Sequence, residues 1–437
     1  MIKREKIGKF CESVIFWLIV AIPFVASFSS AAVDGCIGAL IFFFIFKRVV
    51  LKERNSIPLE KKSFLKGITI HPVLILFFVL FVIALLSFWN TISIDDSLKG
   101  MGKLLKYGFL LIIVFFEVRD VRHIQKIVLA AISGLLLVSL DGIYQLVFGV
   151  DLLRQHHYDV AIGVIRLNAT FPHTNIFAGY LALFIPALIP VVLYYAKKKQ
   201  KVAGIIVVIL ALFCLAFTFC RSALLGVFLV LLLMSVVRKD KVIFVLLLAS
   251  ILVVPFVIPR NVKDWSKTTN SWVEIFLGKD RPIIYETAFN MINHHPFLGV
   301  GVNTFSRNYQ KYKLHNAILD PGNENNVNGS WYAHNSYLQM AGETGIVYFL
   351  VFVVLMFAVF REAIFFYRCM NNDFLKFCSL GIMMGLVSFM VHGFTETNLY
   401  NPKIAVLFWF QVAFLMAVVR IGKDSRTSCS DYLEELS

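Results

Sequence analysis

Charged residues are scarce in this sequence. Asp, Glu, Lys and Arg together make up 16% of its 437 residues, whereas hydrophobic residues make up 59%. Soluble domains typically have about a quarter of their residues charged. The few charges also cluster between long apolar runs, which excludes an ordinary soluble domain and favours a protein whose surroundings are lipid.

Cysteine is equally sparse, with seven scattered residues and no C-x-x-C pair. This excludes a disulfide framework and a zinc site of the usual spacing. The sequence also lacks a D-x-D pair, an H-E-x-x-H motif, a Walker loop and a G-x-S-x-G motif. No cluster of His, Cys and acidic residues has the spacing of metal ligands. We therefore expect no metal and no cofactor.

The apolar runs predict an all-α polytopic membrane protein with about twelve transmembrane helices and one large extracytoplasmic loop. The expected spans are 14–33, 35–46, 72–92, 104–117, 124–148, 175–195, 202–219, 222–237, 242–258, 344–360, 377–394 and 404–419. With the N-terminus inside, cytoplasmic segments hold 27 Lys and Arg and the short outside loops hold 7. The net charge of +15 is therefore explained by the basic residues that hold cytoplasmic segments inside. We expect no nucleic-acid partner.

Two segments interrupt the spans. Residues 149–174 are too polar to cross a membrane, and we expect them on its surface, partly helical. The large loop, 259–343, is expected to contain a helix over 281–295 with Asp280 as its N-cap, then a Gly-rich turn and a turn-rich tip at 321–329. The helical spacing places the apolar residues of that helix on one face: Ile284, Ala288, Met291 and Ile292. The chain is then divided into 1–258 with nine spans, the loop 259–343, and 344–437 with three spans and a short cytoplasmic tail.

His334 stands at the expected membrane–water boundary, just before the tenth span. A histidine is largely neutral at pH 7 and can accept a proton. By position alone, however, a histidine that caps a helix is the better interpretation. His315, in the same loop, is of similar type, and only the anchored position of His334 distinguishes the two.

Three arginines are candidates for binding an anion outside the membrane. Arg221 occupies the tight turn between the seventh and eighth spans, where an arginine beside hydrocarbon either snorkels to the interface or faces a lipid-linked phosphate. Arg281 opens the loop helix, where free N–H groups also favour an anion, although most such arginines are simply exposed. Arg166 is a weaker candidate of the same kind.

Four motifs carry a family resemblance. They are RLNATFPHTNIFA at 166–178, FCRSALLG at 219–226, RPIIYETAFNMINHHPFLGVGVNTF at 281–305 and HNSYLQMAGETG at 334–345. In this order, and with the long loop between late spans, the chain resembles the O-antigen ligase / O-antigen polymerase superfamily of bacterial envelope glycosyltransferases. One departure is Ala169, where the resemblance leads us to expect Gly.

The resemblance implies a GT-C-like fold in the bacterial inner membrane, with an active site facing the periplasm. It implies transfer of a glycan from undecaprenyl pyrophosphate, with inversion and without metal. Arg221, Arg281 and Arg166 would bind the donor, and His334 would act as catalytic base. Ligases use the lipid A–core oligosaccharide as acceptor, polymerases a growing glycan, and O-oligosaccharyltransferases a protein Ser or Thr. The motifs and the 18 residues after the last expected span favour the ligase, with the polymerase second.

A transporter with an outer vestibule is the alternative from a different class. It predicts ionisable residues near the membrane midplane and broken helices in repeated halves. The sequence has few charges inside its apolar runs and no convincing internal repeat, which weighs against transport. A purely structural membrane scaffold would give no reason for the arrangement of the arginines and His334.

Overall fold

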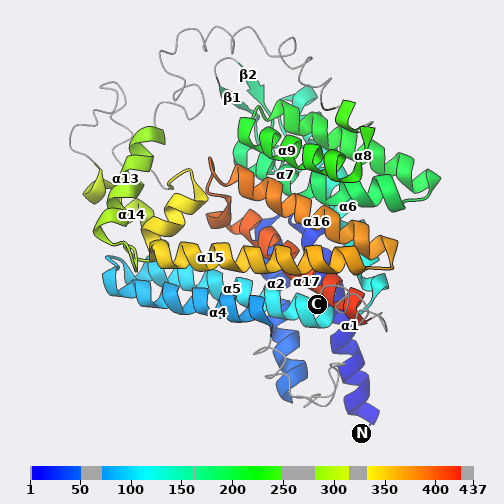
Figure 1. The fold of residues 1–437 in the computed structure, drawn as a ribbon, viewed down its shortest axis with the longest axis horizontal. Coiled ribbons are helices and arrows are strands. Elements are labelled where there is room, and N and C mark those ends of the chain that lie inside the picture. The colour runs from blue at the N-terminus through cyan, green and yellow to red at the C-terminus, as the bar shows by residue number, and fades with distance from the viewer. Residues whose placement is uncertain are drawn as a thin grey trace, which may run out of the picture.

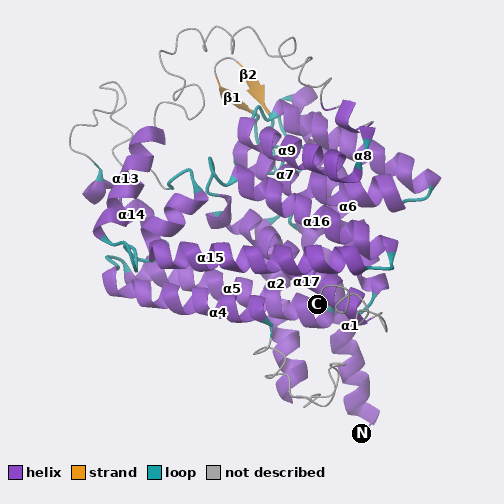
Figure 2. Cartoon of the chain, in the orientation of Figure 1, coloured by secondary structure: helices purple, strands orange, loops and turns teal. Residues whose placement is uncertain are grey.

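The computed structural model describes residues 2–50, 71–161, 164–241, 243–245, 247, 281–313 and 332–424. Within these residues the chain is almost entirely helical, and ten helices are long and apolar enough to cross a membrane. One short pair of strands is seen in the same part of the chain (Figure 2). The predicted fold class is confirmed: this is an all-α, multi-pass membrane protein.

The helices follow the order of the expected spans. Before the large loop come α1 (Ile2–Val25), α2 (Ser30–Ile45), α4 (Pro72–Leu86), α5 (Ile94–Glu117), α6 (Val121–Phe148), α7 (Thr174–Pro190), α8 (Lys198–Phe217) and α9 (Arg221–Arg238). The helices from the large loop onward are α13 (Arg281–His294), α14 (Phe305–Tyr312), α15 (Ser336–Cys369), α16 (Asp373–His392) and α17 (Pro402–Asp424). Short 3-10 or π turns are η1 (Phe46–Val50), η2 (Ser87–Asn90), η3 (Val191–Tyr195) and η5 (Asn398–Tyr400).

Ten of the expected spans overlap mainly one described helix each, whereas 14–33 runs across the turn between α1 and α2. The remaining span, 242–258, lies largely outside the described residues. α5 is too charged in its first turns to qualify as a span by composition. α15 begins earlier than the expected 344, because residues 336–344 form a helical segment of their own. Gly345, with φ +86, separates this segment from the rest of α15, and glycine readily adopts that conformation.

Local sequence sets many of the helix ends. The side chains of Ser29, Ser93, Asp120, Asn335 and Asn372 each accept a hydrogen bond from a backbone N–H in the first turn of the helix that follows. Such caps satisfy N–H groups that have no partner within the helix. At the other end of α6, Gly149 is left-handed, a common way to end a helix.

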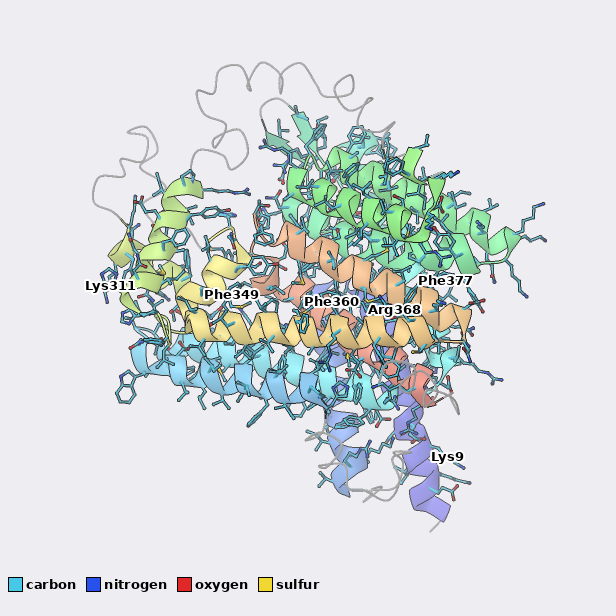
Figure 3. The ribbon with its side chains drawn as sticks, in the orientation of Figure 1. Lys9, Lys311, Phe349, Phe360, Arg368 and Phe377 are labelled. Carbon is cyan, nitrogen blue, oxygen red and sulfur yellow. The ribbon has the colours of Figure 1, made fainter. Side chains whose placement is uncertain are left out.

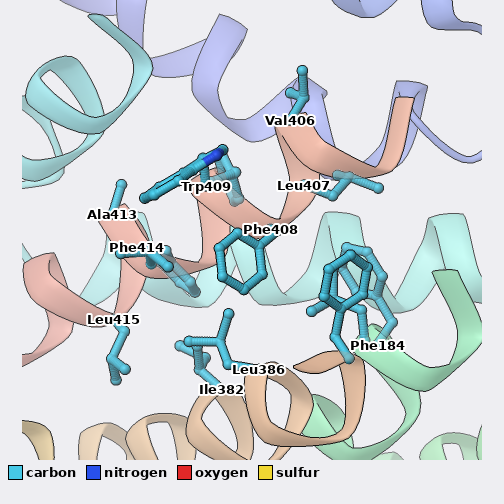
Figure 4. Close-up of a cluster of buried hydrophobic side chains, with 14 of the residues drawn as sticks. Phe184, Ile382, Leu386, Val406, Leu407, Phe408, Trp409, Ala413, Phe414 and Leu415 are labelled. Atoms are coloured by element: carbon cyan, nitrogen blue, oxygen red, sulfur yellow. The ribbon is translucent and has the colours of Figure 1, made fainter. Parts of the chain in front are cut away.

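The centre of the bundle is formed by α17, α7 and α16. In their most apolar windows 94%, 89% and 72% of the residues are buried, against 28% in α2, α8 and α15. Figure 4 shows Phe408 and Trp409 of α17 near Ile382 and Leu386 of α16 and Phe184 of α7. Because lipid is as apolar as these side chains, close packing rather than exclusion of water stabilises this core.

The remaining helices pack around this centre in two groups. α15 packs against α4 and α17, and α5 packs against α17, whereas α9 and α7 pack against α16. α13 and α14 lie beside the first turns of α15, at one end of the bundle (Figure 1). Lys311 of α14 marks that end, and Arg368, in the last turn of α15, lies at the other end (Figure 3).

The segment 149–174 differs from expectation. No helix is described between Val150 and His173; instead β1 (Asp159–Ala161) pairs with β2 (Val164–Arg166) in antiparallel register. The expectation of partial helix was therefore wrong. The buried carboxylate of Asp151 explains part of this difference, because it accepts hydrogen bonds from the backbone N–H groups of residues 153, 154 and 156. These bonds stabilise a turn in place of a helix.

The hairpin also places the start of α7. The Asp159 carboxylate of β1 accepts a 2.6 Å hydrogen bond from the Thr174 hydroxyl, and Thr174 is the first residue of α7. Asp159 pairs with Arg166 across the hairpin. These contacts bring Arg166 and the first turn of α7 to the same end of the bundle as α13.

Candidate active site

A single acidic side chain in the loop between α16 and α17 gathers the candidate residues. Glu396 is buried, and its Oε1 accepts hydrogen bonds from Arg281 and from the Asn175 amide, both at 2.6 Å. Its Oε2 lies 3.5 Å from Nδ1 of His334. One carboxylate therefore joins three places: the first turn of α13, the first turn of α7, and the segment just before α15.

The backbone around Glu396 is held by the first turn of α15. Ser336 donates from its backbone N–H to the Gly393 carbonyl at 2.9 Å and from its hydroxyl to the Glu396 carbonyl at 2.8 Å. The Tyr285 hydroxyl of α13 donates to the carbonyl of His334 at 3.2 Å. The loop, α13 and the start of α15 are thus tied by main-chain contacts as well as by the Glu396 side chain.

His334 has an unusual backbone conformation, with φ +47. Left-handed conformations are uncommon outside glycine, although histidine is among the residues enriched there. The next residue, Asn335, caps α15 through hydrogen bonds to its side chain from the N–H groups of Tyr337 and Leu338. His334 therefore sits immediately before a capped helix, with a partly exposed ring whose Nδ1 faces Glu396.

The arginines converge on the same place. Arg166 donates to the Thr218 carbonyl at 2.9 Å and to the Asn175 side-chain oxygen at 3.0 Å, so Asn175 bridges Arg166 and Glu396. Arg221 opens α9 with an exposed side chain, and the charges of Arg281 and Arg166 act on it. One guanidinium group thus bonds the carboxylate, a second reaches it through Asn175, and the third lies within electrostatic range of the other two. This excess of positive charge can bind an anion with several oxygens.

The electrostatics of Glu396 reflect these neighbours. Burial raises the pKa of its carboxyl, but the hydrogen bond and charge of His334 and the charge of Arg281 outweigh burial, so the net pKa lies below its ordinary value. Glu396 therefore stays ionised, and it can hold the Nδ1 proton of His334. That arrangement leaves Nε2 of the ring as the basic atom, the usual requirement for a histidine base.

α13 owes its position to the Gly-rich turn that follows it. The buried carboxylate of Glu343, in α15, accepts hydrogen bonds from the backbone N–H groups of Asn303 at 2.7 Å and Phe305 at 3.0 Å. The N–H groups of Val300 and Gly301 bond the carbonyls of Gly342 and Glu343. The turn is thereby fastened to α15, which sets where Arg281 meets Glu396.

Comparison with known proteins places this geometry in a family. Residues 206–353 match the family model described as O-Antigen ligase. Over these residues the predicted resemblance to the O-antigen ligase superfamily is confirmed. Among curated proteins, no relative matches the chain.

The family match covers only part of the cluster around Glu396. Arg221, Arg281 and His334 lie within the matched residues, whereas Arg166, Asn175 and Glu396 lie outside them. The matched region therefore contributes two arginines and the histidine to the cluster, and the flanking α7 and the loop between α16 and α17 supply the amide and the carboxylate that hold them. The matched family is glycosyltransferase-like and is associated with lipid-linked glycans.

Of the four residues predicted from the sequence, Arg281, His334 and Arg166 are joined through Glu396 and Asn175, and Arg221 lies within electrostatic range of Arg281 and Arg166. Sequence reasoning missed the two that join them, Glu396 and Asn175. Glu396 was visible only as an acid near a span end. Its signal was its place in GFTETNLYN, a short polar loop on the same side of the membrane as the large loop. Asn175 stands inside the motif at 166–178 but carried no separate signal.

The departure at Ala169 has a local explanation. Ala169 adopts φ +45, a left-handed conformation that costs a residue with a Cβ about 1–2 kcal/mol and costs glycine little. Gln145 offsets part of that cost, because its side-chain oxygen accepts hydrogen bonds from the N–H groups of Asn168 at 3.1 Å and Ala169 at 2.9 Å. The position explains why glycine is the expected residue there.

Some expectations lie outside the described residues: Asp280 as the cap of α13, His315, and the tip at 321–329. The expected helix over 281–295 corresponds to α13. In the part of the chain that is described, no group of three or more His, Cys, Asp or Glu residues is arranged to hold a metal ion.

Proposed function

We propose that this protein is an O-antigen ligase of the bacterial inner membrane. It transfers the O-antigen polysaccharide from undecaprenyl pyrophosphate to the lipid A–core oligosaccharide at the periplasmic face. The observation that carries the proposal is the meeting of Arg281 and His334 on the two oxygens of Glu396, with Arg166 and Arg221 beside them.

The donor is proposed to bind through its pyrophosphate. A diphosphate presents several oxygens, and guanidinium groups can bind them in pairs. Arg221 is exposed at the first turn of α9, and Arg281 opens α13, so their charges are available at the mouth of the cluster. These charges stabilise the negative charge that develops on the leaving pyrophosphate, which is usually the largest contribution to such catalysis.

His334 is proposed to act as the general base. Its Nε2 takes the proton from the attacking hydroxyl of the acceptor sugar while Glu396 holds Nδ1. The acceptor oxygen forms a bond to the anomeric carbon as the bond from that carbon to the phosphate oxygen breaks. Undecaprenyl pyrophosphate leaves with the bonding electrons, and attack from the opposite side inverts the anomeric centre. Such a base contributes about 10²- to 10⁴-fold in rate.

The distribution of buried charge supports a site at the membrane boundary over a transport path. Among the described residues, most buried Asp, Glu and Lys side chains lie near helix ends or in loops: Lys47, Glu117, Asp151, Glu343, Glu396 and Lys403. Asp141 is the exception, about two turns from the end of α6. A transporter would need ionisable groups near the midplane.

The test is the surface glycan of cells that lack this protein. The ligase proposal expects a complete core without long chains, together with accumulation of undecaprenyl-linked polymer. Core bearing a single repeat would instead indicate a polymerase, and loss of a glycan from a protein would indicate an O-oligosaccharyltransferase. Normal long-chain lipopolysaccharide together with unchanged protein-linked glycans in the deleted cells would reject all three.

A further inference from the structure

Arg221 is flanked on both sides by residues that bond the loop carrying Glu396. One residue before it, Cys220 has its Sγ 3.3 Å from Nε2 of His392, the last residue of α16. One residue after it, the Ser222 hydroxyl accepts a 2.5 Å hydrogen bond from the Thr395 hydroxyl. Thr395 directly precedes Glu396. We call these two side-chain contacts the clasp.

The inner half of the clasp is deeply buried. Cys220 is 6% exposed, and His392 is not exposed at all. On its other side, Nδ1 of His392 lies 2.7 Å from the side-chain nitrogen of Asn398, also buried. With that amide donating to Nδ1, a neutral ring carries its proton on Nε2 and donates it to the Cys220 sulfur. His392 therefore links α9 to both sides of the loop 393–401.

Asn398 fits into this position because α7 has a glycine opposite it. A Cβ on Gly179 would come within 2.6 Å of the Asn398 side-chain nitrogen. The same helix carries Asn175, which bonds Glu396. The loop is consequently held between α7 on one side and α9 on the other.

We propose that His392 and the clasp are positioning elements that hold Arg221 at a set distance from Glu396, Arg281 and His334. The inference rests on the proposed function, because it assumes that Arg221 binds the donor pyrophosphate. His392 and Cys220 do not touch the substrate. They act by fixing the first turn of α9 against the loop, so that the exposed guanidinium of Arg221 and the cluster around Glu396 present one combined anion site.

Two matched pairs of substitutions separate a hydrogen bond from packing. Cys220→Ser keeps a group that can accept from His392, whereas Cys220→Ala removes it at nearly the same volume. Thr395→Ser keeps the hydroxyl that donates to Ser222, whereas Thr395→Val removes it. If the clasp positions Arg221, the hydroxyl-bearing member of each pair behaves like the unmodified protein, and its apolar partner loses anion affinity.

The experiment measures binding of inorganic pyrophosphate to the full-length protein in detergent by calorimetry, with thermal unfolding as a check on folding. We expect Cys220→Ala and Thr395→Val to bind about two- to tenfold more weakly, the equivalent of one net hydrogen bond. Cys378→Ala, at a buried cysteine of α16 outside the clasp, is the control and should bind normally. If Cys220→Ala does not fold, the Thr395 pair answers the same question.

A double substitution tests whether the clasp acts through Arg221. In an Arg221→Ala background, which retains Arg281 and Arg166, adding Cys220→Ala should weaken pyrophosphate binding no further. An undiminished second loss would overturn the positioning role, as would normal binding by folded Cys220→Ala and Thr395→Val. Failure of the unmodified protein to bind pyrophosphate would instead reject the proposed donor site, and the inference with it. Measuring pyrophosphate binding by the unmodified protein first distinguishes these two failures.

Discussion

Arg281 donates a 2.6 Å hydrogen bond to Glu396 across 115 positions of sequence. The contact joins the helix of the large loop to the turn between the last two membrane helices. Because Arg281 opens α13 and Glu396 is buried, the loop helix cannot shift without separating a charge pair. Removing Arg281 would leave the Glu396 carboxylate without its nearest cation, so this partly buried contact links the position of the loop helix to the stability of the bundle.

Replacing His334 by Ala should abolish glycan transfer while pyrophosphate binding survives, because the base is lost and the arginines remain. The measurement is transfer by purified protein from a lipid-linked donor, alongside calorimetric binding. His295→Ala, at the residue directly after α13, is the control, because His295 bonds the Tyr312 hydroxyl rather than Glu396. His315→Ala should also have little effect. Near-normal transfer by His334→Ala, with loss in His315→Ala, would mean that the wrong histidine was chosen.

Replacing Arg281 by Lys should weaken donor binding and lower transfer, although the charge is kept. An ammonium group cannot reproduce the planar fork with which Arg281 can bond Glu396 and a phosphate oxygen together. Arg307→Lys offers a matched control, since Arg307 is an exposed arginine of α14 that pairs with Asp96. Equal transfer by Arg281→Lys and the unmodified protein would argue against a bidentate role.

Replacing Glu396 by Gln should lower the turnover number at least about tenfold, because the Nδ1 proton of His334 loses its anionic acceptor. The lowered pKa of Glu396 means that its contribution to stability is present above its ordinary value of 4.5 and is lost as the pH falls below it. Thermal unfolding of Glu396→Gln should therefore depend less on pH on the acid side. A turnover number unchanged from the unmodified protein would remove Glu396 from the mechanism.

The contact between Asp96 of α5 and Arg307 of α14 should make the large loop acid-sensitive. The hydrogen bond from Arg307, with one from Ser93, lowers the pKa of Asp96 from 3.8 to about 2. A lowered pKa contributes stability that is present above about pH 4 and is lost as the pH falls through about 2. Asp96→Asn should flatten that acid loss in thermal unfolding, whereas Asp95→Asn, at its exposed neighbour, should not.

The expected topology, with both termini inside and residues 259–343 outside, predicts a labelling pattern. A membrane-impermeant thiol reagent applied from outside should modify a cysteine introduced by Asn325→Cys and miss one introduced by Lys199→Cys. The prediction rests on the excess of Lys and Arg in the expected cytoplasmic segments. The reverse pattern would place Glu396 and its partners on the cytoplasmic side, where the proposed donor and acceptor are not presented.

Sequence alone was sufficient for the features that depend on local order. Apolar runs of membrane-crossing length predicted the helices, and the residues Ile284, Ala288, Met291 and Ile292 predicted the buried face of α13, all four of which are buried. These succeed because helix length and helical spacing are properties of consecutive residues. The same local reasoning failed over 149–174, where side chains that bond the backbone, such as Asp151, favour turns and a hairpin over a helix.

The sequence by itself also singled out Arg166, Arg221, Arg281 and His334, since their motifs carry the resemblance to the family. Only the tertiary structure decided what joins them. Asn175 comes from α7 and Glu396 from the loop between α16 and α17, and their approach to α13 depends on packing around α17 and on the fastening of the Gly-rich turn to α15. A carboxylate partner 115 residues away leaves no periodic trace in the chain, because long-range contacts are set by how whole helices pack and not by the spacing of neighbouring residues.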